Sequence, residues 1–313
     1  MKGICLVTGG AGFIGSHLVE ALADDGFQVR VLDSLVKGKQ SSIAHLVDDG
    51  LVEFVEGDIR NRDIVDKAVS GTDYVFHTAG VHIKRSVASP EECLEVNIRG
   101  SYNVFKSALD HGVKRVIFSS SSSVYGDPKT LPMSEDGLID PVEPYGASKW
   151  MVEQLLAFLA KSGLKYNALR YFNVYGERQA AHAFYTTVII AFIKRILNGQ
   201  SPMIDGKGDQ SMDFTHVKDV VRANVLAMQS EATNQAFNVG TGVSTTVRDL
   251  AAILIEAVNA DVEPVFSGQA SLVTRRQAGT RKARDLLAFE AEIDVRDGLT
   301  KVARAIAEHP DLY

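Results

Sequence analysis

KGICLV at residues 2–7 is a short apolar stretch that continues directly into TGGAGFIGS at residues 8–16. This pattern predicts a buried strand, a tight glycine turn and the start of a helix. Gly9 permits the turn, Gly12 leaves room for a pyrophosphate beside backbone N–H groups, and Gly15 lets the helix lie close to the strand. The helix N-terminus then faces the anion. Taken alone, the motif also fits a glycine-rich turn that binds nothing.

The next predicted strand, residues 28–33, ends in the carboxylate of Asp33. It follows the glycine turn by about 20 residues, the spacing at which an acidic side chain accepts hydrogen bonds from the adenosine ribose hydroxyls. A carboxylate at this point also repels a 2′-phosphate. We therefore predict a dinucleotide site that takes NAD in preference to NADP.

Size, charge and cysteine content narrow the class of protein. The chain has 313 residues, enough for a large core and two linked lobes. Its 33 basic and 39 acidic residues give a net charge of −6 with no basic run, so we expect no nucleic-acid and no membrane partner. The two cysteines, Cys5 and Cys93, suggest a reducing compartment, and the sequence shows no signal peptide or membrane-length apolar run. We expect a cytoplasmic protein.

Strand-like and helix-like segments alternate along the first half of the chain. Apolar runs at residues 54–58, 74–77, 116–119 and 167–171 each follow an amphipathic stretch, which predicts an α/β fold with a parallel, doubly wound Rossmann sheet. Residues 1–172 are the expected NAD-binding domain. Residues 173–313, with helices at 187–197 and 246–258, are the expected smaller, interleaved substrate-binding lobe, and parts of about 214–242 return to the first domain. Because ligands bind at the carboxyl ends of parallel strands, one sheet edge should carry Gly9, Asp33, Asp58, Ala79 and Ser121.

A second pattern consists of FSSSSSVYG at residues 118–126 and YGASK at residues 145–149. Tyr145 and Lys149 are four residues apart, so a helix that begins near Tyr145 places both on one face. The ammonium then favours the phenolate of a tyrosine whose free pKa is near ~10, which makes it a possible general base. Ser121 could hold the same substrate hydroxyl. Chance occurrence of the helical pair and a solvated serine turn are the alternatives.

Several motifs in a fixed order resemble the extended short-chain dehydrogenase/reductase family. They are TGGAGFIG at 8–15, Asp33, GDI at 57–59, HTAG at 77–80, Asn97, SSSSVYG at 120–126, YGASK at 145–149, RYFNVYG at 170–176, DFTHVKDV at 213–220 and FNVGTG at 237–242. The likeness spans almost the whole chain. Within the family, the order and spacing are most similar to the nucleotide-sugar epimerase/dehydratase branch, and to the UDP-galactose 4-epimerase group within it.

The resemblance implies roles for individual residues. Tyr145 takes a proton from a sugar hydroxyl, Lys149 binds the nicotinamide ribose and lowers the tyrosine pKa, and Ser121 orients the hydroxyl. The implied cofactor contacts are Gly9, Gly12, Phe13, Ile14, Gly15, Asp33, Asp58, Ile59, Ala79, Gly80, Asn97, Tyr145 and Lys149. The implied or suggested substrate contacts are Ser121, Ser123, Tyr145, Asn173, Arg275 and Arg276.

The residues before Val124 help to choose the reaction. Dehydratases and decarboxylases of the branch typically carry an acidic residue there, whereas this chain has Ser122 and Ser123. Oxidation alone is then the simplest chemistry. A hydride passes from the sugar carbon, most simply C4, to NAD and returns to the opposite face. We predict an NAD-dependent nucleotide-sugar epimerase; the alternatives are a dehydratase, decarboxylase or 4-keto-sugar reductase, or a noncatalytic NAD-binding sensor.

The chain departs from its relatives where they bind the nucleotide diphosphate. Met212 and Gln269 stand where many relatives carry arginines, whose planar fork pairs with phosphate oxygens. We hypothesise that Arg275 and Arg276 take over this recognition. Relatives dimerise through the helix after Tyr145 and one near residues 91–111, so we expect a homodimer. Single histidines and two distant cysteines give no metal-ligand spacing, so we expect no metal.

Overall fold

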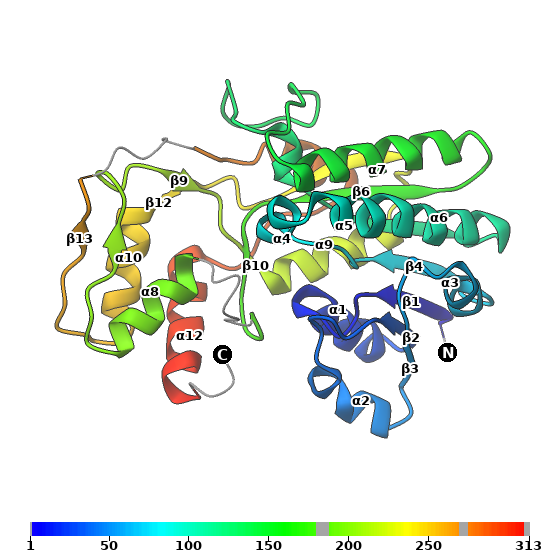
Figure 1. Cartoon of the computed structure of the whole chain (residues 1–313), viewed down its shortest axis with the longest axis horizontal. Helices are drawn as coiled ribbons and strands as arrows, with labels where there is room; N and C mark the ends of the chain where they lie inside the picture. The colour runs from blue at the N-terminus through cyan, green and yellow to red at the C-terminus, as the bar shows by residue number, and fades with distance from the viewer. Residues whose placement is uncertain (1, 180–187, 269–274, 310–313) are drawn as a thin grey trace.

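The computed structural model describes residues 2–179, 188–268 and 275–309, and its centre is a seven-stranded parallel sheet (Figure 1). Its order across the sheet confirms the predicted doubly wound fold. The strands are β11 (Gln235–Val239), β6 (Tyr166–Tyr171), β5 (Arg115–Ser121), β4 (Tyr74–His77), β1 (Ile4–Thr8), β2 (Gln28–Asp33) and β3 (Val52–Glu56).

Strand β3 is the one that differs most from its predicted position. It ends at Glu56, which pairs with Asp33 at the end of β2, rather than at Asp58. The Gly57 amide closes this edge by donating to the Asp33 carbonyl at 2.9 Å. Asp58 therefore lies in the loop beyond the strand, not in the strand itself.

Helices cover both faces of the sheet (Figure 1). On one face lie α1 (Phe13–Asp24), α2 (Ala44–Asp48), α9 (Val217–Gln229) and α11 (Arg281–Leu287). On the other lie α3 (Arg62–Val69), α6 (Ser101–Asp110) and α7 (Pro144–Ala160). Short elements complete this part: the 3₁₀ turns η1 (Gln40–Ser42) and η3 (Ser122–Tyr125), α4 (Ile83–Ala88), α5 (Pro90–Cys93) and the π-helical η2 (Leu94–Gly100).

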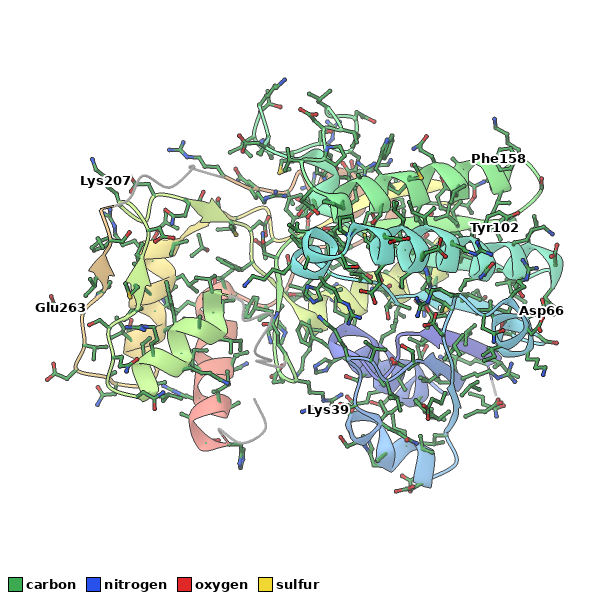
Figure 2. The ribbon with its side chains drawn as sticks, in the orientation of Figure 1. Lys39, Asp66, Tyr102, Phe158, Lys207 and Glu263 are labelled. Carbon is green, nitrogen blue, oxygen red and sulfur yellow. The ribbon has the colours of Figure 1, made fainter. Side chains whose placement is uncertain are left out.

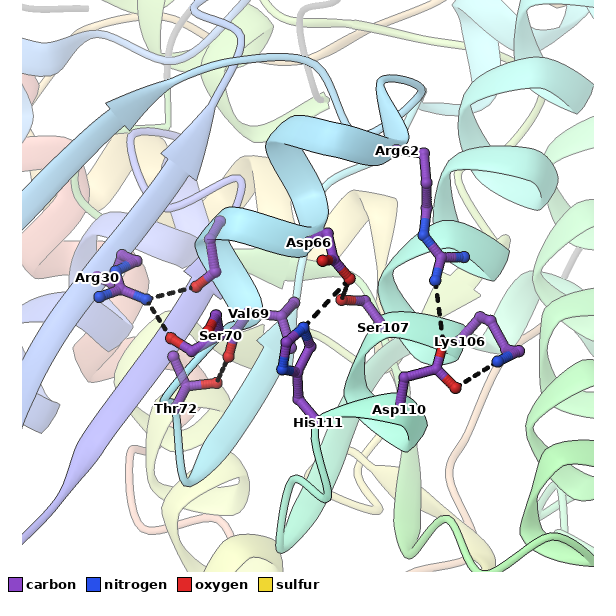
Figure 3. A network of polar contacts seen from close by, with 11 residues as sticks. Arg30, Arg62, Asp66, Val69, Ser70, Thr72, Lys106, Ser107, Asp110 and His111 are labelled. Atoms are coloured by element: carbon purple, nitrogen blue, oxygen red, sulfur yellow. Dashed lines mark hydrogen bonds and ion pairs between the residues drawn. The ribbon is translucent and has the colours of Figure 1, made fainter.

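A polar network ties α3 to α6 at the surface (Figure 3). Asp66 accepts hydrogen bonds from Ser107 Oγ at 2.9 Å and from His111 Nε2 at 3.2 Å. Arg62 pairs with Asp110 at 3.1 Å. These exposed contacts contribute little each, and the apolar face beneath them provides most of the helix packing.

A second lobe packs around its own apolar cluster. Its helices are α8 (Val188–Leu197), α10 (Val247–Ala257) and α12 (Val295–Glu308). The predicted helix at 246–258 corresponds to α10, and that at 187–197 to α8, although residue 187 lies outside the described residues. Three two-stranded pairs frame this half: β7 (Val174–Tyr175) with β10 (Thr215–His216), β8 (Met203–Ile204) with β13 (Val265–Phe266), and β9 (Ser211–Met212) with β12 (Thr245–Thr246).

The chain crosses between the two halves more than once. After β10, α9 packs on α1 and β11 joins the edge of the main sheet beside β6. Both elements fall in the segment expected to return to the first domain. The domain boundary at residue 172 itself stays a prediction.

Within the described part of the chain, no helix has both the length and the apolar character needed to cross a bilayer. Cys5 and Cys93 are both buried and free.

Candidate active site

Three glycines shape the turn between β1 and α1. Gly9 has a positive φ of 71°, and a Cβ on Gly15 would lie 2.1 Å from the Gly9 carbonyl oxygen, so both positions require glycine. Gly12 caps α1 without a side-chain hydrogen bond. The first N–H groups of the helix, which begins with Phe13 and Ile14, lack partners inside the helix and can meet an anion.

Asp33 ends β2 beside this turn and is buried. Its Oδ2 accepts a hydrogen bond from the Ala11 amide at 3.0 Å, and its Oδ1 accepts one from the Leu35 amide at 2.8 Å. Burial raises its pKa, and the two amide donors work in the opposite direction. Each oxygen retains a lone pair for a ribose hydroxyl.

Ala79 and Gly80 follow β4 and lie against the glycine turn. A Cβ on Gly9 would lie 2.8 Å from the Ala79 nitrogen. A Cβ on Gly80 would lie 3.1 Å from Asn97 Oδ1 and 3.7 Å from Lys149 Nζ. The structure therefore brings the glycine turn, the end of β4 and the lysine of the second motif together.

Asn97 lies within η2 and is 2% exposed. Its Oδ1 accepts from the Val81 amide at 2.7 Å, and its Nδ2 donates to Ser148 Oγ at 2.9 Å. The side chain thus holds the loop after β4 against α7. This positioning role was missed from the sequence, because it depends on contacts between distant segments.

Asp58 and Ile59 lie in the loop after β3. Asp58 accepts hydrogen bonds from the Arg60 guanidinium, including one from Nη2 at 2.7 Å, and these lower the pKa of its carboxyl. Ile59 is buried, and its carbonyl accepts from Asn103 Nδ2 at 3.0 Å. The loop is therefore fixed from α6, at the sheet edge where the predicted nucleotide site lies.

Lys149 is a buried cation, at 4% exposure. Its Nζ donates to the Ser119 carbonyl at 2.7 Å, and lies 4.8 Å from the Phe118 ring centre and 5.5 Å from that of Tyr145. Burial lowers its pKa to about 8. Tyr145 lies in the first turn of α7, which Pro144 opens, and is only half-buried. The helix thus places the ammonium beside the phenol ring, as the spacing predicts.

The serine run divides into different roles. Ser120 points to α7, where its Oγ donates to Glu153 at 2.5 Å. Ser121 ends β5 and caps η3, and its Oγ accepts from the Ser123 amide at 3.1 Å. Ser122 and Ser123 are buried in the turn. The Ser121 hydroxyl hydrogen remains available to a substrate oxygen.

Glu143, the N-cap of α7, brings a carboxylate close to this turn. Its Oε1 accepts from the Gly146 amide at 3.0 Å, and a Cβ on Gly146 would lie 2.5 Å from the Ser123 carbonyl oxygen. Burial raises the pKa of Glu143. Sequence reasoning missed this residue, although a polar side chain before Pro144 is a typical helix start.

Asn173 lies between β6 and β7 with a positive φ of 30°. Its Nδ2 donates to the Asp213 carbonyl at 3.1 Å, and its own carbonyl accepts from the Thr215 amide at 3.3 Å. Asn173 therefore joins the end of the main sheet to the second lobe.

The two candidate arginines have different surroundings. Arg275 is exposed and forms a β-bridge with Ser211. Arg276 is half-buried, and its Nη1 donates to the Ser122 carbonyl at 3.1 Å. Met212 pairs with Thr245 in the β9–β12 ladder. Gln269 lies outside the described residues.

A buried ion pair behind the serines was also missed. Arg170 on β6 and Glu153 on α7 pair at 2.7 Å with side chains only 4% and 5% exposed. Arg170 also donates to Tyr125 OH at 2.8 Å. The sequence spacing does indicate that Glu153 lies near the site, because Glu153 follows Lys149 by one helical turn and shares its face.

No cluster of three or more histidine, cysteine or acidic side chains able to hold a metal occurs among the residues that the structure describes.

Comparison with known proteins gives consistent matches. The model of the NAD-dependent epimerase/dehydratase family matches residues 5–240. The UDP-glucose 4-epimerase of Mycolicibacterium smegmatis is 35% identical over 301 residues, which cover 95% of this chain and 96% of that protein.

Two solved structures of similar fold are also nucleotide-sugar epimerases. The UDP-glucose 4-epimerase of Thermotoga maritima, solved with UDP-glucose, is similar at a TM-score of 0.90 and 36% identity, covering 97% of this chain and 99% of that one. The UDP-N-acetylglucosamine 4-epimerase of Methanobrevibacter ruminantium, solved with UDP-N-acetylmuramic acid, gives a TM-score of 0.92 and 35% identity, covering 98% and 99%.

Proposed function

Because the chain belongs to the NAD-dependent epimerase/dehydratase family and is an NAD-dependent nucleotide-sugar epimerase, we propose that Ser121, Tyr145 and Lys149 carry its reaction at C4 of the sugar. The relatives act on UDP-glucose and UDP-N-acetylglucosamine, and we propose UDP-hexoses as the substrate class. The two halves are proposed as an NAD-binding domain and a substrate-binding lobe.

The residues at the carboxyl edge of the sheet fit NAD. Gly9 and Gly15 let the turn close tightly, because a Cβ at either position would meet Ala79 or the Gly9 carbonyl. At Gly12 only the Gly9 carbonyl oxygen lies near the place of a Cβ, which leaves that backbone open to a pyrophosphate, and Asp33 offers acceptors to the ribose. Phe13, Ile14, Asp58, Ile59, Ala79, Gly80 and Asn97 are the further proposed contacts. When bound, NAD supplies the acceptor for the sugar hydride and returns that hydride to the opposite face.

Tyr145 is the proposed base, which takes the proton of the sugar C4 hydroxyl and gives it back after the hydride returns. Lys149 stabilises the phenolate by its charge. Ser121 donates its hydroxyl hydrogen to the same sugar oxygen and holds it near Tyr145. Ser123 and Asn173 are proposed to contact the sugar or its diphosphate.

One observation supports this assignment most strongly. The Lys149 ammonium lies beside the Tyr145 ring while it is held by the carbonyl of Ser119, two residues before Ser121. The end of β5 and the first turns of α7 therefore bring Ser121, Tyr145 and Lys149 to the same place. A structural lysine has no need to be buried next to a half-exposed phenol.

The test uses the purified enzyme without added cofactor. UDP-glucose and UDP-N-acetylglucosamine are each incubated with it, and the isomers are separated by chromatography. Conversion to the C4 epimer by an enzyme that carries bound NAD supports the proposal. Absence of any isomer with both sugars, despite bound NAD, contradicts it.

A dehydratase is the second candidate. Ser122 and Ser123 provide no carboxylate, but Glu143 brings one close to the serine turn. Elimination of water from the oxidised sugar needs such an acid or base. Appearance of a 4-keto-6-deoxy sugar in the same incubation favours this candidate over the epimerase.

Arg275 and Arg276 are the proposed substitutes for the missing diphosphate arginines. The support is their position next to the strand pair that carries Met212. Substitution of both by alanine should weaken binding of the substrate, and unchanged affinity would remove the idea.

We also propose a homodimer formed through α6 and α7. Four apolar side chains on η2, α6 and α7 are exposed: Leu94 at 52%, Tyr102 at 39%, Met151 at 50% and Phe158 at 63%. Figure 2 shows Tyr102 and Phe158 on these neighbouring helices. Covering such side chains is a typical use of a dimer interface. A monomer in dilute sedimentation runs would contradict this proposal.

A cytoplasmic location is proposed as well. It is supported by two buried, unpaired cysteines, which suit a reducing compartment. Fractionation of cells that express the tagged chain tests it.

A further inference from the structure

Glu153 holds β5 at the residue that lies between two residues of the site. Ser120 Oγ donates to Glu153 Oε1 at 2.5 Å, and both residues are buried. Ser119, on one side of Ser120, accepts the hydrogen bond of Lys149 through its carbonyl at 2.7 Å. Ser121 lies on the other side. The end of the strand is therefore attached to α7 twice, at Lys149 and again one helical turn later at Glu153.

Arg170 on β6 fixes the carboxylate that makes this second attachment. Its Nε donates to Glu153 Oε1 at 3.0 Å and its Nη2 to Oε2 at 2.7 Å, which is the paired geometry of an arginine fork. Its Nη1 donates to Tyr125 OH at 2.8 Å and to the Glu135 carbonyl at 3.2 Å. The guanidinium also lies 5.0 Å from the ring centre of Tyr125 and 5.8 Å from that of Trp150. These contacts keep the fork in one place, and with it the carboxylate that it binds.

The charge of Glu153 acts on Lys149 as well. Burial lowers the pKa of Lys149, and the charges of Cys93 and Glu153 oppose that effect. The neighbouring groups that burial keeps uncharged at neutral pH are Cys93, Tyr125 and Tyr166, whose pKa values rise, and His77, whose pKa falls to about 3. Glu153 is then the negative charge that favours the ammonium of Lys149, while Arg170 balances Glu153 itself. Loss of the Glu153 charge would leave two buried cations and lower the pKa of Lys149 further.

Stability alone does not require this arrangement. Replacing a buried ion pair by well-packed apolar side chains is often neutral for stability. Apolar side chains, however, could neither accept the hydrogen bond of Ser120 nor place a negative charge one turn from Lys149.

We propose that Glu153 is a positioning residue of the proposed epimerisation. Held by Arg170, it fixes the end of β5 against α7 and keeps Lys149 charged beside Tyr145. This inference rests on the proposed function and deepens it, because it adds a residue that acts through Lys149 and Ser121 rather than by contact with the substrate.

The experiment compares the NAD-loaded wild type with Glu153→Gln and Ser120→Ala, using UDP-glucose and UDP-N-acetylglucosamine. Glu153→Gln removes the charge, and we expect kcat to fall about 100-fold, the cost of displacing a reacting group by about 1 Å, with little change in KM. The alkaline limb of its kcat–pH profile, where Lys149 loses its proton, should move to a lower pH by about 1 pH unit. Ser120→Ala keeps both charges, so kcat should fall by a smaller factor and the limb should stay in place.

The matched control is Ser107→Ala, because this buried serine on α6 donates to Asp66 on α3 at 2.9 Å, away from the site. It should keep the wild-type kcat and pH profile. Emission of Trp150, the only tryptophan of the chain, and the thermal unfolding temperature show whether each variant is folded. If Glu153→Gln does not fold, Ser120→Ala decides the positioning step by itself.

Three results overturn the inference. A Ser120→Ala enzyme with the wild-type kcat would show that the hydrogen bond does not position the strand. An alkaline limb that stays in place in Glu153→Gln would exclude the effect on Lys149. Losses that appear in KM alone, or equally in Ser107→Ala, would leave Glu153 with a structural role only.

Failure of the proposed function gives a different result. If the wild type epimerises neither sugar, NMR of protein labelled with carbon-13 at lysine Cε still follows the titration of Lys149, whose signal Lys149→Met identifies. We expect Glu153→Gln to move this titration lower by about 1 pH unit. An unchanged titration would contradict the inference whether or not the enzyme turns over.

Discussion

The Lys149 ammonium lies 5.5 Å from the centre of the Tyr145 ring and donates a 2.7 Å hydrogen bond to the Ser119 carbonyl. The carbonyl fixes the lysine from β5, while one turn of α7 fixes its distance from the phenol. The charge is therefore held at a set position relative to the ring, and no carboxylate in the described part of the chain forms an ion pair with it. Such an arrangement favours the phenolate and leaves the ammonium free to contact a ribose.

Replacement of Tyr145 by phenylalanine should lower kcat by about 10²–10⁴-fold, the range of a lost general base. Bound NAD, measured by absorbance of the released cofactor, should change little. Tyr74→Phe, at the opposite end of the sheet on β4, is the matched control and should keep full activity. A Tyr145→Phe enzyme with normal kcat would exclude the phenol from catalysis.

The low pKa of Lys149 predicts a pH-dependent stability. Its pKa falls to about 8 in the folded chain through burial, against 10.5 as the ordinary value. Between these values the unfolded chain binds the proton and the folded chain does not, so stability contributed by this residue rises with pH there. Below about 8 both states are charged, and the full cost of burying the charge applies.

The measurement is urea unfolding of the cofactor-free wild type and Lys149→Met from pH 7 to pH 10. The methionine variant should be the more stable at pH 7, and the gap should narrow by at most about 1.4 kcal/mol per pH unit above pH 8. A gap that stays constant would show that the lysine titrates normally.

The sequence predicted the elements in which local pattern and packing agree. The strands ending at Asp33 and His77 were placed at their observed bounds, because each alternates with a helix and stops at a turn. Tyr145 and Lys149 were placed on one face because helical spacing alone decides it. Asp58 was misplaced, since a carboxylate just after a strand has no local signal that separates it from the strand.

Contacts between distant segments could not be predicted. The bonds of Asn97 to Val81 and Ser148 join three segments across the sheet edge, and the π-helical turn around Asn97 has no periodic signal. The different surroundings of Arg275 and Arg276 also depend on the β-bridge between Arg275 and Ser211. Sequence alone made the two arginines equivalent.

The glycines of the turn should respond differently to alanine. A Cβ on Gly15 would lie 2.1 Å from the Gly9 carbonyl, so Gly15→Ala should cost about 1–3 kcal/mol in unfolding free energy, as overpacking does. A Cβ on Gly12 would lie 3.1 Å from the same oxygen, and its φ of −80° is ordinary. Gly12→Ala should therefore fold normally yet release NAD. Thermal unfolding and cofactor content measure both effects, and equal destabilisation by the two changes would contradict this contrast.

Asp33→Asn should weaken NAD retention. The carboxylate accepts from two backbone amides and keeps acceptors for the ribose, whereas an amide offers one oxygen. Loss of a hydrogen bond to a charged group, about 1.5–3 kcal/mol, corresponds to roughly a tenfold to hundredfold rise in Kd. Equilibrium dialysis measures it. Glu56→Gln is the control, because Glu56 pairs with Asp33 across the strands but is exposed, and an equal effect in both variants would deny Asp33 a specific role.

Removing one partner of the Glu153–Arg170 ion pair should lower the free energy of unfolding more than replacing both partners by apolar residues. Arg170 donates to Glu153 at 2.7 Å, and Ser120 Oγ donates to the same carboxylate, with both charged side chains buried. Glu153→Leu leaves an arginine without its counter-ion and should cost about 3–5 kcal/mol in unfolding free energy. The double variant Glu153→Leu with Arg170→Met removes both charges and should recover much of that loss. Urea unfolding of Glu153→Leu, Arg170→Met and the double variant decides the matter. If the double variant is as unstable as the sum of the two single changes, the pair contributes through packing rather than charge.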